Sequence, residues 1–112
     1  MSPVLPLPVT ESDHDNCAAT GILRLVGQKW TVVLLALLAE QPYGFNELDR
    51  TIHGVSRRIL TRTLRHLEQE NLISRVRTPQ RAEYTLTDAG RTLLPLIIAL
   101  GEWAADHHTR RP

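Results

Sequence analysis

The feature that most restricts the fold is a segment near the middle of the chain, about residues 56–71, in which two stripes follow the period of an α-helix. Leucines at positions 60, 64 and 67 fall at i, i+4 and i+7, with Ile59 beside them, and predict a buried face. Ser56 is expected to cap this helix. Four polar residues fall at i, i+3, i+4 and i+7 and predict an outward face: Arg58, Thr61, Arg62 and Arg65.

The segments on either side of this helix predict a recurring arrangement. A shorter helix is expected over about residues 46–52, and a glycine-containing turn of three residues, His53–Val55, joins the two helices. Two short strands follow, at residues 72–77 and 83–86, separated by the turn signal Thr78–Gln80. Helix, short turn, helix and hairpin is the order of a winged helix-turn-helix. We therefore predict a mainly α fold with a small β-hairpin wing.

The N-terminal part of the chain predicts an arm and two helices. Residues 1–15 have several prolines and no regular period, which is typical of a flexible arm. A first helix, capped by Asp15 or Asn16, is expected to end at Gly27. A second helix, Lys29–Glu40, is apolar around most of its circumference, so we expect it to form the centre of the core.

The last helix predicts a partner subunit. It is expected to run from a cap at Thr87 to about His107, with Pro95 kinking it or lying in its early part. This helix is more apolar than one face of so small a domain requires, so a second subunit is expected to cover the rest, the alternative being a lid within one chain. The expected homodimer interface is Ile22, Leu25, Leu93, Leu96, Ile97, Leu100 and Trp103. The predicted divisions are a flexible arm at 1–15, a winged helix-turn-helix domain with dimerisation helices at both ends at 16–107, and a tail at 108–112.

The charge of the chain is uneven, although its net value is only +1. Residues 1–49 carry two bases and six acids, for −4; residues 50–81 carry eight arginines and two acids, for +6; residues 82–112 carry three arginines and four acids, for −1. A basic block of this kind usually faces a polyanion, the alternative being a solvated arginine-rich face. Few acids share the helix with these arginines, and the arginines repel one another at this spacing, so an outside anion is the better explanation.

Double-stranded DNA fits this pattern of charge. An α-helix enters the major groove, where arginine pairs with guanine, and a helix N-terminus such as that at Arg57 favours a phosphate. Basic residues of the hairpin, Arg75, Arg77 and Arg81, are placed to reach the minor groove or the phosphates, the alternative being an edge hairpin blunted by charge. The residues expected to bind DNA are Arg57, Arg58, Thr61, Arg62, Arg65, Asn46, Lys29, Arg77 and Arg81.

Other functional classes have little support in the sequence. The longest apolar run is ten residues, Trp30–Ala39, which is too short to span a bilayer, and a single cysteine excludes an internal disulfide framework, so a cytoplasmic protein is expected. There is no glycine-rich phosphate loop and no plausible Ser/His/Asp set, so we expect neither an enzyme nor a cofactor. The acids and histidines at 13–15 and 107–108 match no zinc spacing, and we expect no metal site. His53 and His66 are expected to be solvated.

An ordered set of residues from Cys17 to Trp103 resembles the HxlR family of winged helix-turn-helix regulators. The matching residues are Gly27-Gln-Lys-Trp-Thr31, Phe45-Asn-Glu-Leu48, Gly54-Val-Ser56, Leu60-Thr61, Leu64, Leu67-Glu68, Leu72-Ile73, Glu83-Tyr-Thr-Leu-Thr-Asp-Ala-Gly90, Leu94-Pro95 and Trp103. The resemblance implies a homodimeric bacterial transcription factor on a pseudo-palindromic operator, with residues 56–71 reading the groove, the hairpin as wing and the terminal helices forming the dimer. The chain departs from the family in a shorter wing and in Cys17-Ala18 where a cysteine-proline pair is frequent.

Cys17 is the candidate for regulation. A position near a helix N-terminus lowers a thiol pKa, whereas nearby Asp13 and Asp15 would raise it, and a buried inert cysteine is the alternative. The resemblance implies a sensor of an oxidant or small electrophile at this position. The prediction is a repressor that responds through Cys17. Two other readings stay open: a winged-helix module that binds protein, and a regulator that senses a small ligand at the dimer interface.

Overall fold

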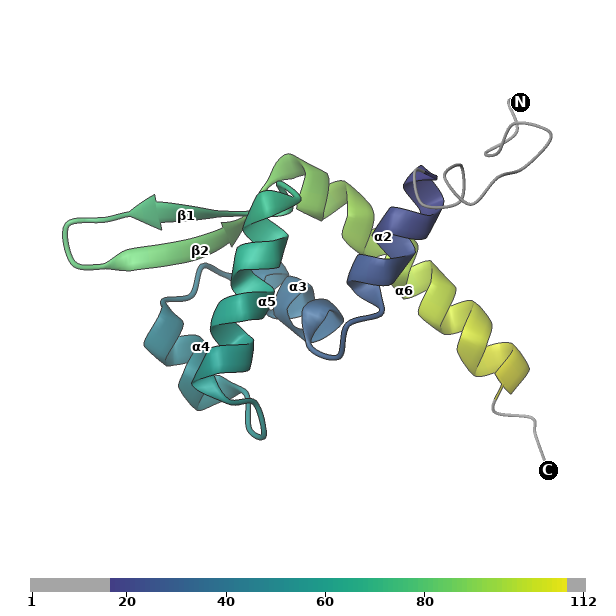
Figure 1. Cartoon of the computed structure of the whole chain (residues 1–112), viewed down its shortest axis with the longest axis horizontal. Helices are drawn as coiled ribbons and strands as arrows, with labels where there is room; N and C mark the ends of the chain where they lie inside the picture. Colours follow the sequence, from purple (N-terminus) through teal and green to yellow (C-terminus); the bar gives the residue numbers. More distant parts are fainter. Residues whose placement is uncertain (1–16, 109–112) are drawn as a thin grey trace.

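The computed structural model describes residues 17–108 and confirms the predicted class, a mainly helical domain with a two-stranded hairpin (Figure 1). The arm predicted for residues 1–15 and most of the predicted tail lie outside the described residues. The elements are α2 (Ala18–Val26), α3 (Thr31–Glu40), α4 (Phe45–Thr51), α5 (Arg57–Gln69), β1 (Ile73–Arg77), β2 (Ala82–Leu86) and α6 (Asp88–His108).

Short polar side chains begin two of these helices as the sequence predicts. The Ser56 hydroxyl accepts a hydrogen bond from the Ile59 N–H at 3.1 Å and caps α5. The Thr87 hydroxyl accepts from the Gly90 N–H at 3.1 Å and caps α6. The prediction for α2 is wrong, because its N-cap residue is Cys17; the predicted caps, Asp15 and Asn16, lie outside the described residues.

The core consists of leucines from α3, α4 and α5 together with the base of the hairpin. The side chains below 2% exposure include Leu34, Leu35, Leu38, Leu48, Leu60, Leu64, Leu67 and Ile73. The buried face predicted for α5 is therefore confirmed. The prediction for α3 is only partly right, because Val32 and Val33 are 38% and 39% exposed. Helix α3 packs against β2, α6 and α2, and these elements do not surround it.

The hairpin is antiparallel and is attached to the core at its base. Ile73 pairs with Leu86, both buried, and Arg77 pairs with Ala82 near the tip. Gly90 in the first turn of α6 is required by packing, since a Cβ there would lie only 2.3 Å from the Leu72 carbonyl oxygen. Helix α6 then leaves the body of the molecule on the side opposite to the wing (Figure 1).

Helix α6 continues through Pro95, which lies seven residues after Asp88, where the helix begins. In the first turn of a helix a proline costs no hydrogen bond, but Pro95 lies beyond that turn and therefore removes one hydrogen bond of the helix. Among residues 17–108, no single helix is both long and apolar enough to cross a membrane; α2 and α3 satisfy both conditions only when taken together, and they meet at a bend of 82°.

Candidate nucleic-acid interface

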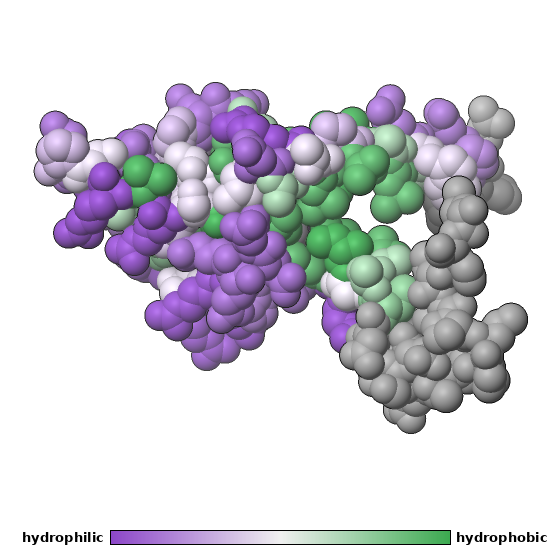
Figure 2. Space-filling model, turned by 90° about the horizontal axis from the view of Figure 1, so that it is seen from above, coloured by the Kyte–Doolittle hydropathy of each residue, from purple (hydrophilic) through white to green (hydrophobic). Residues whose placement is uncertain are grey.

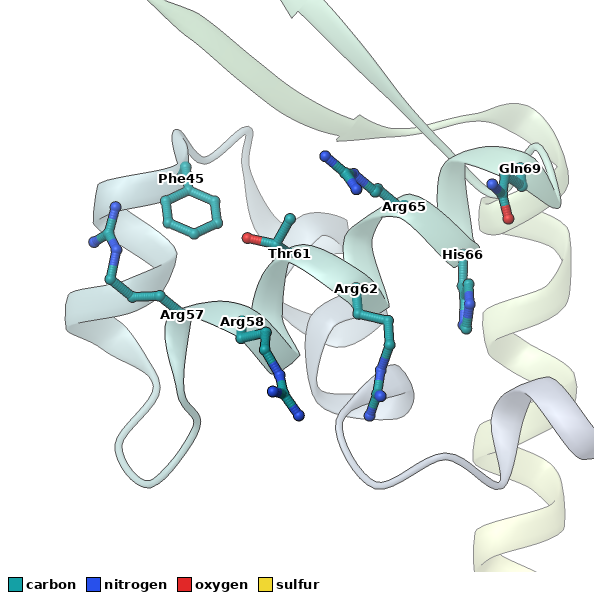
Figure 3. Close-up of a pocket in the computed structure, with 8 residues that line it drawn as sticks. All are labelled: Phe45, Arg57, Arg58, Thr61, Arg62, Arg65, His66 and Gln69. Carbon is teal, nitrogen blue, oxygen red and sulfur yellow. The ribbon is translucent and has the colours of Figure 1, made fainter.

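The outward face of α5 is open and basic. Arg58, Arg62 and Arg65 are exposed, and within residues 17–108 none of the three makes an ion pair or hydrogen bond. Figure 3 shows Arg58 and Arg62 extending to one side of α5, whereas Thr61 and Arg65 extend to the other. Together with their neighbours, these four side chains line one shallow groove along the helix. The full lining is Phe45, Arg57, Arg58, Thr61, Arg62, Arg65, His66 and Gln69. The structure therefore brings the predicted stripe together on a free surface.

Arg57 differs from its three neighbours because it is bound to α4. Its Nη1 lies 2.9 Å from Asp49 Oδ2 and 3.5 Å from Asn46 Oδ1, and its guanidinium lies 4.8 Å from the centre of the Phe45 ring. The two helices of the helix-turn-helix are thus joined at the start of α5. Asn46 and Arg57, both predicted to bind DNA, contact each other here.

Lys29 lies near the basic face although it precedes α3. Its ammonium is 5.4 Å from the centre of the Trp30 ring. A hollow beside α5 is lined by Lys29, Arg62 and His66 together with residues of the α4–α5 turn. His66, predicted to be solvated, is half-buried, and its Nδ1 lies 3.4 Å from Gln28 Oε1 in the α2–α3 turn.

The three arginines of the hairpin have two different environments. Arg75 and Arg77 are exposed and, in the part of the chain that the structure describes, make no ion pair. Arg81 instead pairs with Glu83 of β2 and with Glu47 of α4. The hydrogen bond to Glu83, and then the charge of Glu47, raise the pKa of Arg81. Of the hairpin arginines predicted to bind DNA, Arg77 is free and Arg81 is held.

Tyr84 of β2 is half-buried against the core and was not predicted to be a site residue. Burial raises the pKa of Tyr84, and the charge of Glu68 raises it further, whereas Arg75 and Arg65 oppose the shift. The charges of Arg65 in α5 and Arg75 in β1 therefore both act on this half-buried tyrosine. In the sequence, the only signal for Tyr84 was its place in the Glu-Tyr-Thr-Leu stretch at 83–86.

Cys17 begins α2 and is 8% exposed. The backbone N–H of Thr20 and then the Thr20 hydroxyl lower the pKa of the Cys17 thiol, while burial opposes them. The direction agrees with the effect expected at a helix N-terminus. The opposing carboxylates, Asp13 and Asp15, lie outside the described residues. No group of three metal-ligating side chains occurs within residues 17–108.

Away from the wing, apolar residues gather on the surface, with hydrophilic residues beyond them (Figure 2). In α6, Leu96, Leu100 and Trp103 are 68%, 52% and 54% exposed. The other residues of the predicted dimer interface face inward in the single chain: Leu25 belongs to the core, and Ile22, Leu93 and Ile97 pack against it. The predicted set thus divides into an inner row and an outer row.

The order of elements, the free basic helix and the hairpin define a winged helix-turn-helix protein. The model of the HxlR-like helix-turn-helix family matches residues 25–112, and the chain belongs to this family. An uncharacterized HTH-type transcriptional regulator of Methanothermobacter thermautotrophicus is 38% identical over 94 residues, which are 81% of this chain and 72% of that protein. The family and this relative are helix-turn-helix transcriptional regulators, and this chain is a DNA-binding transcriptional regulator.

Solved structures show the same fold. The reduced form of the regulator YodB from B. subtilis superposes with a TM-score of 0.76 at 27% identity, covering 81% of this chain and 93% of that one. The redox regulator HypR in its reduced form superposes with a TM-score of 0.69 at 30% identity, covering 80% and 92%.

Proposed function

We propose that the chain is a repressor that binds a pseudo-palindromic operator as a homodimer in the cytoplasm, with α5 of each subunit in the major groove. The observation that carries the proposal is the row Arg58, Arg62 and Arg65, exposed on one helix and without an ion pair within residues 17–108. A guanidinium fork pairs with guanine at O6 and N7, and each good pair discriminates by roughly 1–3 kcal/mol. Thr61 on the same face suits a phosphate or a thymine methyl group.

The flanking groups suit contacts that position the protein on the duplex. Lys29 lines a hollow beside α5, and Asn46 lies next to Arg57 at the start of α5, where an ammonium or an amide can bind a phosphate oxygen. Arg57 has an exposed guanidinium beside the α5 N-terminus, and Arg75 and Arg77 extend along the wing. Phosphate contacts of this kind set orientation and register, and leave sequence readout to α5.

The homodimer is supported by the outer row of α6. Leu96, Leu100 and Trp103 expose large apolar side chains on one side of a helix, together with Ile98 elsewhere on it. Large apolar patches on a soluble protein usually mark an interface. A two-fold dimer presents two copies of α5, and two copies match an operator of two inverted half-sites.

Regulation through Cys17 is supported by its lowered pKa and by its relatives. The thiolate is the reactive form of cysteine, and hydrogen bonds from Thr20 favour it. Related solved structures include a quinone-bound YodB and an oxidized HypR, at 27% and 31% identity to this chain. We propose that an oxidant or electrophile reacts at Cys17, which begins α2, and that the change reaches α5 through the dimer.

Selection of bound DNA from a random pool tests the proposed function. The proposal predicts enrichment of two inverted half-sites about one helical turn apart, because each subunit places one α5 in the major groove. It also predicts that affinity falls steeply with salt, since each neutralised phosphate releases counterions. The proposal would be overturned if the selection recovered unrelated sequences and the protein bound all of them equally well at every salt concentration.

A further inference from the structure

A three-residue charge cluster connects the wing to α4. Arg81, which directly precedes β2, places Nη2 2.7 Å and Nε 3.2 Å from Glu83 Oε2. The same Nη2 pairs with Oε1 of Glu47 in α4, and that oxygen also accepts the Gly44 N–H at 3.0 Å. One guanidinium therefore holds a carboxylate of the wing and a carboxylate of the helix-turn-helix, and the second carboxylate is itself fixed by the backbone.

The surroundings hold Arg81 in this position. Its carbonyl oxygen accepts from the Thr78 N–H at 2.7 Å, and its own N–H donates to the Thr78 hydroxyl at 3.1 Å, which closes the hairpin turn. Two backbone hydrogen bonds between Tyr43 and Tyr84, at 3.1 and 2.7 Å, attach β2 to the residues before α4. The wing is thus joined to the α4 region at two points, by the Tyr43–Tyr84 bridge and by Arg81.

The charge of Arg81 is neutralised by ion pairs within the protein. Two carboxylates surround it, whereas Arg75 and Arg77 have no such partner within residues 17–108. If Arg81 turned to a DNA phosphate, Glu47 and Glu83 would be left without their cation next to a polyanion, and both would repel it.

We propose that Arg81 is a positioning residue that fixes the wing against α4, so that Arg75 and Arg77 reach the duplex at a set distance from α5. The inference rests on the proposed function, in which α5 and the wing bind one duplex. It assigns Arg81 a role different from a DNA contact. Glu47 is then a positioning residue of the DNA-binding surface, although it is acidic.

Three variants test the assignment: Arg81→Gln, Glu47→Gln and Glu83→Gln. Glutamine at position 47 keeps an oxygen for the Gly44 N–H and removes only the ion pair to the wing. We expect Arg81→Gln and Glu47→Gln each to weaken binding of selected DNA by about two- to fivefold, the range of an exposed ion pair. The double variant should bind no more weakly than Arg81→Gln alone, because both changes break one link. Glu83→Gln removes the same charge within the hairpin, leaves the link to α4, and should bind at least as well as the wild type.

The salt dependence separates this role from a phosphate contact. If Arg81 only positions the wing, it neutralises no phosphate itself, so any change in the slope of log affinity against log salt in Arg81→Gln comes from Arg75 and Arg77 and is matched in Glu47→Gln. If Arg81 binds a phosphate, the slope shrinks by about one unit in Arg81→Gln alone and Glu47→Gln strengthens binding as Glu83→Gln does, because it frees the guanidinium. Either of these results overturns the inference. Arg81→Lys, which keeps one charge for Glu47, should recover part of the affinity.

Amide hydrogen exchange tests the link in the absence of DNA. We expect faster exchange at the Tyr43 and Tyr84 amides in Arg81→Gln and Glu47→Gln, and wild-type rates in Glu83→Gln. Equal rates in all proteins would overturn the link itself. If the link is present but the wild type binds no DNA, the proposed function fails and the positioning role fails with it. If DNA binds normally and exchange is unaffected, only the role of Arg81 fails.

Discussion

The two ends of the molecule share one core but expose different kinds of side chain. At one end, α5 and the wing expose arginines, and toward the other, α6 exposes Leu96, Leu100 and Trp103. Helices α5 and α6 obey the same rule, with one apolar row turned toward the core. What remains outside is cationic in α5, whereas in α6 it includes a row of large apolar side chains. The remaining face, and not the buried one, is the guide to the partner: a polyanion for α5 and, in the homodimer that we propose, the second subunit for α6.

The difference also predicts opposite responses to salt. Binding by arginines releases counterions from DNA and weakens as salt rises. Association through leucines removes apolar area from water and is little affected by moderate salt.

The largest effect is expected from the outward arginines of α5. Changing Arg58, Arg62 or Arg65 to alanine should weaken specific binding by roughly 1–3 kcal/mol for a base contact, or about 5- to 150-fold. Titration of labelled operator at fixed salt measures this. Arg91→Ala, at an exposed arginine of α6, is the matched control and should bind like the wild type. If Arg91→Ala loses as much affinity as the α5 variants, only total charge matters.

A second variant is expected to separate the subunits. Leu100→Glu places a charge on the exposed row of α6 and should shift the protein to monomer by at least about tenfold in dissociation constant, because an unpaired charge would be buried in the dimer. Sedimentation or light scattering measures the mass. The monomer should remain folded, since Leu100 is 52% exposed in the single chain.

Ala105→Glu is the control for this variant. It adds the same charge to α6 roughly half a turn around from the outer row. A dimer of equal strength in Ala105→Glu and loss of the dimer in Leu100→Glu would locate the interface on that row. Equal association in both variants would show that the apolar end has another use.

Cys17 tests whether the two ends communicate. Exposure to diamide or a quinone should change operator affinity by about fivefold or more, the size of a typical coupling between sites. Cys17→Ser should abolish the response, because it removes the only thiol of the chain. An equal response in wild type and Cys17→Ser would exclude the thiol as the switch.

The pH dependence of Cys17 alkylation gives a separate check. Hydrogen bonds from Thr20 lower the pKa of this thiol, so its reaction rate should rise with pH and reach its midpoint below that of an ordinary cysteine. Thr20→Val removes the hydroxyl and should move the midpoint upward. A midpoint at or above the ordinary value would contradict the assignment of a favoured thiolate.

The smallest effect is expected at Arg57. Asp49→Asn breaks an ion pair in which Arg57 is 64% exposed, so the melting temperature should change by no more than the equivalent of about 1 kcal/mol. Glu102→Gln, at an exposed acid of α6, is the control. A large loss of stability specific to Asp49→Asn would show that the pair holds the two helices together.

The sequence predicted features that depend on near neighbours. The period of Leu60, Leu64 and Leu67, the caps at Ser56 and Thr87, and the hairpin all act within a few residues, and the structure confirms them. The free row on α5 followed from the same period. A helical pattern repeats locally, so one sequence is sufficient to locate it.

The features that the sequence could not predict need the arrangement of separate elements. Arg57 and Arg81 look like the other arginines until α4 brings Asp49 and Glu47 to them. The exposure of Val33 depends on which side of α3 the hairpin and α6 cover. The division of the α6 residues into inner and outer rows has the same cause, because both rows are equally apolar in sequence.

Repeating the DNA selection with each α5 arginine variant tests the central claim most directly. If α5 lies in the major groove, alanine at Arg58, Arg62 or Arg65 removes preference at particular base pairs, and removes it symmetrically in both half-sites. An arginine that binds a phosphate lowers affinity at every sequence and leaves the preference intact. Full wild-type preference and affinity in all three variants would contradict the claim that this helix reads DNA.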